Sequence, residues 1–161
     1  MGKEAKTNAM RILERAKVPY TAHEYAHEEG VAVDGVTVAK SMGFDPAQVF
    51  KTLVARGASG QYYVFDVPVA ESLDLKKAAK AVGEKSIEML HQKELLPLTG
   101  YVHGGCSPVG MKKLFPTVFH SSAENLAAMI VSAGKIGYQV ELAPHDLAAL
   151  VRAKFADIIV E

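Results

Sequence analysis

The fold is decided by the stretch VFKTLVARGASGQYYVFDV, which covers residues 49–67. Two runs rich in β-branched and aromatic residues, 49–55 and 61–67, flank a break that contains two glycines. This arrangement is typical of a β-hairpin. Asp45-Pro46 precedes the hairpin and supplies a capping acid with proline at the first helical position, which predicts a single helical turn there.

Helical and extended segments are predicted on both sides of the hairpin. A helix capped by Thr7 should end near Pro19. The other predicted helices cover 36–42, the segment from Asp74 to Gly83, a helix broken by Pro97, one opened by a Ser121-x-x-Glu124 capping box, and one that begins at Pro144. The predicted strands cover 21–25, 85–88, a strand end at Val102, 117–120, 129–132 and 137–142 around an Ala133-Gly134-Lys135 turn, and 155–160.

Hairpins outnumber strand–helix–strand crossovers in this order. The pattern favours an α+β fold, with a mixed, mainly antiparallel sheet or barrel surrounded by helices. The chain has 161 residues and 49% apolar composition, without a linker or an internal repeat. We therefore expect residues 1–161 to form a single domain.

Composition limits the functional classes. No apolar run approaches the ~20 residues that span a bilayer, and residues 1–8 lack the apolar stretch of a secretory signal. A single cysteine excludes an internal disulfide. Eighteen basic and eighteen acidic residues cancel, so there is no overall positive charge for nucleic acid. The expectation is a cytoplasmic protein that binds neither membrane nor DNA.

Lys51 interrupts a strand that is otherwise apolar on both faces. One interpretation is a lysine on an edge strand whose ammonium reaches solvent. The other is an ammonium held in a pocket, where it would meet a phosphate or a developing oxyanion. The pattern alone leaves both open.

Gly104-Gly105-Cys106-Ser107-Pro108 forms a second candidate site. Adjacent glycines allow positive φ, so their N–H groups could converge on an anion, although a plain tight turn fits as well. Cys106 lies close to His103 in sequence, which raises the alternative of a thiolate nucleophile. Most lone cysteines, however, are inert small hydrophobes.

Two further motifs are incomplete. Gly134-Lys135 resembles part of a phosphate loop, but Met129 stands where that loop needs glycine and Ile136 where it needs serine or threonine. His23 and His27 have a spacing suited to a shared metal, yet no third ligand follows at a recognisable spacing. The sequence predicts neither a metal nor a cofactor.

Several segments together resemble the YbaK family of aminoacyl-tRNA deacylases, over residues 7–158. They are Val49-Phe-Lys-Thr-Leu53, Leu73-Asp-Leu-Lys-Lys-Ala-Ala-Lys80, Thr99-Gly-Tyr-Val-His-Gly-Gly-Cys-Ser-Pro108, Val131-Ser-Ala-Gly-Lys135 and Lys154-Phe-Ala-Asp157. The resemblance implies a barrel-like core, with a pocket for the aminoacylated 3′ end of tRNA. The family often has glycine where Ala133 stands and an acidic residue where Gln139 stands.

The resemblance also implies roles for individual residues. Lys51 matches the functional lysine of the family, and Tyr25 matches a pocket tyrosine. Substrate-binding positions are expected at Tyr25, Gly104, Gly105, Ser107, Pro108, Gly134 and Lys135.

The implied activity is hydrolysis of mischarged Cys-tRNA(Pro), in which the cysteinyl thiol attacks its own ester. The implied partners are the acceptor end of tRNA(Pro) and prolyl-tRNA synthetase. A module that binds an acceptor end or a free amino acid without turnover is the alternative.

Overall fold

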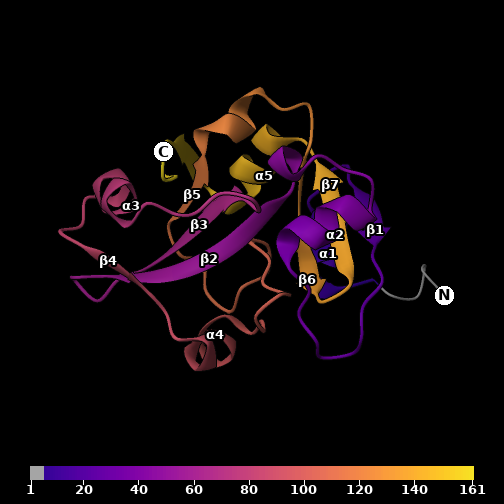
Figure 1. Cartoon of the computed structure of the whole chain (residues 1–161), viewed down its shortest axis with the longest axis horizontal. Coiled ribbons are helices and arrows are strands. Elements are labelled where there is room, and N and C mark those ends of the chain that lie inside the picture. The colour runs from indigo at the N-terminus through magenta and orange to yellow at the C-terminus, as the bar shows by residue number, and fades with distance from the viewer. Residues whose placement is uncertain (1–5) are drawn as a thin grey trace.

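A computed structural model describes residues 6–161 and contains five α-helices and eight strands within that range (Figure 1). The helices are α1 (Asn8–Arg15), α2 (Gly35–Ser41), α3 (Leu75–Val82), α4 (Gln92–Thr99) and α5 (Pro144–Val151). The strands are β1 (Thr21–Glu24), β2 (Phe50–Gly57), β3 (Tyr62–Pro68), β4 (Ile87–Met89), β5 (Thr117–His120), β6 (Met129–Lys135), β7 (Tyr138–Leu142) and β8 (Ala153–Ala156). The predicted lack of an apolar secretory stretch in residues 1–8 falls partly on residues 1–5, which lie outside the described range.

The strands form two separate sheets. The larger sheet has the order β4-β2-β3-β5-β8, antiparallel from β4 to β3 and parallel from β3 to β8. The smaller sheet, β1-β7-β6, is antiparallel throughout. The predicted α+β class with a mixed, mainly antiparallel sheet is confirmed. The barrel alternative is wrong, because in the described chain only one isolated bridge, Val49 to Ile130, joins the two sheets.

The hairpin of β2 and β3 is confirmed. Its register runs from Phe50 opposite Pro68 to Arg56 opposite Tyr62. The predicted turn before β2 is a 3-10 helix, Pro46–Gln48, in which Asp45 Oδ1 accepts a hydrogen bond from the Ala47 N–H at 2.9 Å.

Glycine and acidic caps set the ends of α3 as predicted. Asp74 Oδ1 accepts hydrogen bonds from the backbone N–H groups of Lys76 and Lys77. Gly83 ends the helix in the left-handed region at φ 74°, a conformation that glycine adopts without steric cost.

Some local predictions were wrong. Helix α4 continues through Pro97. Proline lacks an N–H group, so the helix loses only the hydrogen bond to the carbonyl of Lys93. No strand ends at Val102, because the whole segment 101–116 is irregular. The capping box at Ser121 and Glu124 is absent: Ser121–Asn125 is a 3-10 helix with His120 at its N-cap position, where the side chain makes no capping hydrogen bond.

The turn between β6 and β7 also lies further along the chain than predicted. Ala133, Gly134 and Lys135 belong to β6, and the chain reverses at Ile136 and Gly137. Gly137 has φ +100°, so the glycine required by the turn is the second one rather than Gly134.

Two large apolar clusters organise the fold. Helices α1 and α5 pack with the small sheet and Phe119 in one cluster, and α3 packs with β2, β3 and Ile158 in the other. A third cluster packs the 101–116 segment, through Cys106 and Phe115, against Val54 and Val64. No helix within residues 6–161 combines the length and the apolar character that crossing a bilayer requires.

Candidate functional site

A cavity of about 340 Å³ lies along β2, where the two sheets meet. Strand β4 pairs with β2 only over Ala55–Gly57, and one further hydrogen bond joins the Leu90 N–H to the Val54 carbonyl, so β4 does not cover the segment before Val54. The cavity is lined by Tyr25, Ala32, Val33, Asp34, Gly35, Val38, Val49, Phe50, Lys51, Thr52, Leu53, Val69, Leu95, His103, Gly104, Cys106, Ser132 and Gln139. The lining therefore comes from both sheets, α2, α4 and the 101–116 segment.

Lys51 is half-buried at this edge. Burial lowers the pKa of its ammonium, while the carboxylates of Asp34 and Glu71 oppose that shift and favour the charged form. Asp34 is held in place because it caps α2, where its Oδ2 accepts a hydrogen bond from the Thr37 N–H at 3.1 Å. The lysine is thus a cation placed in a cavity beside a fixed anion.

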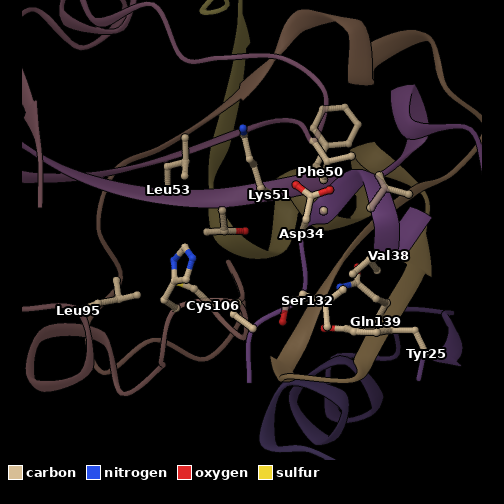
Figure 2. Close-up of a pocket in the computed structure, with 18 residues that line it drawn as sticks. Tyr25, Asp34, Val38, Phe50, Lys51, Leu53, Leu95, Cys106, Ser132 and Gln139 are labelled. Atoms are coloured by element: carbon tan, nitrogen blue, oxygen red, sulfur yellow. The ribbon is translucent and has the colours of Figure 1, made fainter. Parts of the chain in front are cut away.

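The Lys51 side chain lies on one side of β2, and several other lining residues lie on the opposite side. Figure 2 shows Lys51 and Leu53 extending from one face of β2, while Cys106, Ser132 and Gln139 lie across the strand from them. This follows from the alternation of side chains along a strand. The cavity consequently extends around the edge of β2. The ammonium lies on one side, and a largely neutral surface that includes Cys106, Ser132 and Gln139 lies on the other; this surface is the cavity floor.

Gly104 belongs to the floor and adopts φ +88°. A Cβ at this position would lie 2.7 Å from the Ala32 Cβ, so both the conformation and the space require glycine. Gly105 is not part of the lining; a Cβ there would lie 3.1 Å from the Ile136 backbone nitrogen. The two glycines therefore allow this segment to pack closely on the β6–β7 turn.

The other expected binding residues lie outside the cavity lining. Ser107 is fully buried, and its Oγ accepts a hydrogen bond from the Val109 N–H at 3.1 Å. Pro108 is also buried. Gly134 packs against Tyr101, whose Cε1 would lie 2.9 Å from an added Cβ. Lys135 is exposed, and its Nζ lies 5.4 Å from the ring centroid of Tyr138.

The structure thus places three of the expected residues, Tyr25, Lys51 and Gly104, around one cavity. Gly105, Ser107, Pro108, Gly134 and Lys135 form part of its surroundings or lie further away. Their roles in binding stay predictions.

Cys106 lines the cavity, but its environment disfavours a thiolate. Burial raises the pKa of the thiol to about 12, and the charge of Asp66 adds to the shift. A nucleophilic cysteine requires the opposite, a lowered pKa beside a cation or a base. The raised pKa of the buried thiol therefore argues against the cysteine-hydrolase alternative, even though His103 lines the same cavity.

The two histidines considered for metal binding have other partners. His23 Nε2 lies 2.8 Å from Glu141 Oε1, and His27 Nδ1 lies 2.8 Å from the Tyr25 carbonyl oxygen. Within residues 6–161, no group of three or more His, Cys, Asp and Glu side chains is arranged to hold a metal ion.

Sequence reasoning missed several polar residues of the site. Asp34, Thr52 and Ser132 line the cavity. Asp66 lies behind it, fully buried in the middle of an apolar strand. The available signal was the same as for Lys51: a charged residue inside a run of apolar ones. Gln139 is 7% exposed, and its Oε1 has no hydrogen-bond partner among the described residues.

Comparison with known proteins defines the class. The sequence model of the family described as "Aminoacyl-tRNA editing domain" matches residues 29–150. The chain belongs to this family, and the resemblance to YbaK-type editing domains is confirmed.

A curated relative is similar over nearly the full chain. The Enterococcus faecalis protein named "Putative Cys-tRNA(Pro)/Cys-tRNA(Cys) deacylase EbsC" is 48% identical over 155 residues, which cover 96% of this chain and 94% of the relative.

Two solved structures are similar in fold. One is described as "a putative trans-editing enzyme for prolyl tRNA synthetase"; it has a TM-score of 0.80 and 25% identity, and covers 96% of this chain and 99% of its own. The other, a hypothetical protein, has a TM-score of 0.82 at 18% identity, with 93% and 97% covered. At that identity it supports the fold alone.

Proposed function

We propose that this protein is a trans-editing deacylase that hydrolyses Cys-tRNA(Pro). Membership of the aminoacyl-tRNA editing family supports the reaction class. The name of the 48% identical relative supports the cysteinyl substrate, and the related prolyl-tRNA trans-editing structure supports tRNA(Pro).

The proposed chemistry uses the nucleophile of the substrate itself. The cysteinyl sulfur attacks the ester carbonyl carbon, the bond from that carbon to the ribose 3′ oxygen breaks, and the 3′ oxygen takes up a proton. The released thiolactone then adds water across its carbon–sulfur bond to give cysteine. Holding an internal nucleophile in attack geometry lowers the barrier by several kcal/mol without a protein nucleophile.

The roles proposed for Lys51, Gly104 and Tyr25 follow from their positions in the cavity lining. Lys51 supplies positive charge for the terminal phosphate and for the oxyanion that develops on the carbonyl. Gly104 allows the acceptor end to approach the backbone, and Tyr25 forms a wall of the aminoacyl pocket. Gly105, Ser107, Pro108, Gly134 and Lys135 shape or flank this region.

One observation carries the proposal: a lysine ammonium and a thiol with a raised pKa line the same cavity. A cavity of this kind stabilises negative charge but offers no thiolate of its own. Substrate-assisted hydrolysis fits that composition better than covalent catalysis by Cys106.

The test is turnover. Purified protein is incubated with Cys-tRNA(Pro) and, as a control, with correctly charged Pro-tRNA(Pro). We expect free cysteine and free tRNA from the first and an intact ester in the second. Saturable binding of Cys-tRNA(Pro) that leaves its ester intact would identify a binding module and contradict the proposal.

A second experiment addresses the partner. The chain has no net charge, and strong binding to a tRNA body requires clustered cations. We propose that prolyl-tRNA synthetase supplies selectivity for the tRNA. Adding the synthetase should increase the preference for Cys-tRNA(Pro) over Cys-tRNA(Cys), whereas an unchanged preference would contradict this role.

A further inference from the structure

A carboxyl group lies directly behind the cavity. Asp66 on β3 is 0% exposed and stands opposite Thr52 of β2 in the strand register. Its Oδ1 accepts a hydrogen bond from the Thr52 hydroxyl, and its Oδ2 has no partner within residues 6–161. Thr52, unlike Asp66, is part of the cavity lining.

This arrangement fixes the direction of the threonine hydroxyl. An ionised carboxylate only accepts hydrogen bonds, so the single proton of the Thr52 hydroxyl is directed to Asp66. The lone pairs of the hydroxyl oxygen are then available to the cavity. Thr52 therefore presents a hydrogen-bond acceptor, with a buried negative charge behind it.

An aminoacyl ester carries one group that matches such an acceptor. Its α-ammonium has three N–H donors and a positive charge, and a charge-assisted hydrogen bond is about twice as strong as a neutral one. Asp34, the carboxylate that does line the cavity, is already engaged as the cap of α2 and acts on Lys51. Asp66 has no such competing cation.

We propose that Asp66 is a positioning residue that acts through the Thr52 hydroxyl to recognise the α-ammonium group of the aminoacyl substrate. The inference rests on the proposed function, because it assigns one part of that substrate to one part of the cavity. It also places the amino group on the floor side of β2, across the strand from Lys51.

The surroundings of Asp66 define when it is charged. From β2 it faces Thr52, from β5 its register partner is Phe119, and from the 101–116 segment the titratable neighbour is the Cys106 thiol. Burial raises the pKa of Asp66 to about 7, and the Thr52 hydrogen bond opposes that shift. Recognition of the ammonium should therefore strengthen as the pH rises towards 7, and weaken again above about 8, where an α-amino group with its ordinary pKa loses its proton.

The first test measures binding of two stable analogues. One is 3′-(L-cysteinylamino)-3′-deoxyadenosine, and the other is its 3-mercaptopropionyl counterpart, which lacks only the α-amino group. At pH 7.5 we expect wild type to bind the amino analogue about tenfold more tightly, as one charge-assisted hydrogen bond provides. Asp66→Asn and Thr52→Val should each reduce that preference below about threefold.

A double variant distinguishes joint action of Asp66 and Thr52 from a general packing effect. The double variant Asp66→Asn/Thr52→Val should lose no more preference than Thr52→Val alone, because the two groups act in series. Thr52→Ser keeps the hydroxyl and should keep the preference. Asp146→Asn, at an exposed position in α5, is the matched control.

A spectroscopic readout tests the link without ligand. The Thr52 methyl signal in NMR should titrate near pH 7 in wild type and stay constant in Asp66→Asn. A wild-type signal that does not move near pH 7, or an Asp66→Asn variant that keeps the tenfold preference, would overturn the inference. If wild type hydrolyses Cys-tRNA(Pro) in that case, the proposed function stands; wild type that neither binds the analogues nor hydrolyses the ester would overturn both.

Discussion

Lys51 and Thr52 are adjacent on β2, but the charged groups found at these two positions, the Lys51 ammonium and the Asp66 carboxyl, have opposite surroundings. Lys51 extends from one face, half-buried, with Asp34 and Glu71 to support its charge. Thr52 contacts Asp66, whose carboxyl is fully buried without a cation beside it. The first charge is accessible to a ligand, and the second reaches the cavity only through a hydroxyl.

The difference shows how a single strand edge can serve both ends of one substrate. An accessible ammonium suits the anionic acceptor end, whereas a buried carboxyl behind a hydroxyl suits a small cationic group. Four substitutions test this division.

Lys51→Ala should have the largest effect. Removing a group that stabilises developing charge typically costs 10²–10³-fold in rate, so we expect kcat/KM for Cys-tRNA(Pro) to fall at least about 100-fold. Lys135→Ala is the matched control: Lys135 is outside the cavity lining, and its loss should cost less than about threefold. Similar losses of kcat/KM in the two variants would show that Lys51 contributes no more to the reaction than an exposed lysine outside the cavity.

Asp66→Asn should change how stability depends on pH. The pKa of Asp66 is about 7 in the folded protein and near 3.8 without burial. Between these values the folded state binds a proton that the unfolded state has lost, so the free energy of unfolding falls as pH rises.

Relative to Asp66→Asn, wild type should therefore lose about 4 kcal/mol of stability from pH 4 to pH 8. Urea denaturation at a series of pH values measures this. Parallel stability profiles for the two proteins would show that Asp66 titrates as an ordinary exposed carboxyl.

Gly104→Ala should reduce stability by about 2 kcal/mol, because a left-handed conformation and a close contact act together. The added Cβ would meet Ala32, itself part of the cavity lining. Thermal denaturation gives the loss, with Gly60→Ala as control: Gly60 also has positive φ but has open space around its Cβ position. Equal losses would mean that only the backbone conformation matters at Gly104.

Cys106→Ala should have the smallest effect on the reaction, less than about twofold in kcat/KM. A thiol with a pKa of about 12 has almost no thiolate at neutral pH. Wild type should also react slowly with iodoacetamide at pH 7.5. If Cys106→Ala lost activity and Lys51→Ala kept it, the protein would be a cysteine hydrolase with Cys106 as its nucleophile.

The sequence predicted the parts of the fold that depend on local pattern. The β2–β3 hairpin, the Asp45 and Asp74 caps and the Gly83 helix end all arise from residues close together in the chain. The parallel pairings of β3 with β5 and of β5 with β8 join distant segments, and no local periodicity encodes them. The turn at Gly137 was misplaced because Gly134 offers an equally plausible glycine three residues earlier.

The site residues divide in the same way, into those that local sequence indicates and those whose role depends on contacts between distant segments. Lys51 stood out because a charge inside an apolar strand is visible in the sequence itself, and the family resemblance implied its functional role. Asp66 carries the same signal, but its meaning depends on Thr52 standing opposite it and on the Cys106 thiol being close enough to feel its charge. The family resemblance placed Ser107 and Lys135 in the site, whereas one is buried in its own loop and the other is exposed away from the lining.

The most direct measurement compares single-turnover hydrolysis of Cys-tRNA(Pro) and Ser-tRNA(Pro). The two esters differ only in sulfur against oxygen, so the comparison isolates the nucleophile that the substrate would supply. We expect the cysteinyl ester to be cleaved at least about 100-fold faster, in wild type and in Cys106→Ala alike. Equal rates for the two esters would contradict catalysis by the thiol of the substrate.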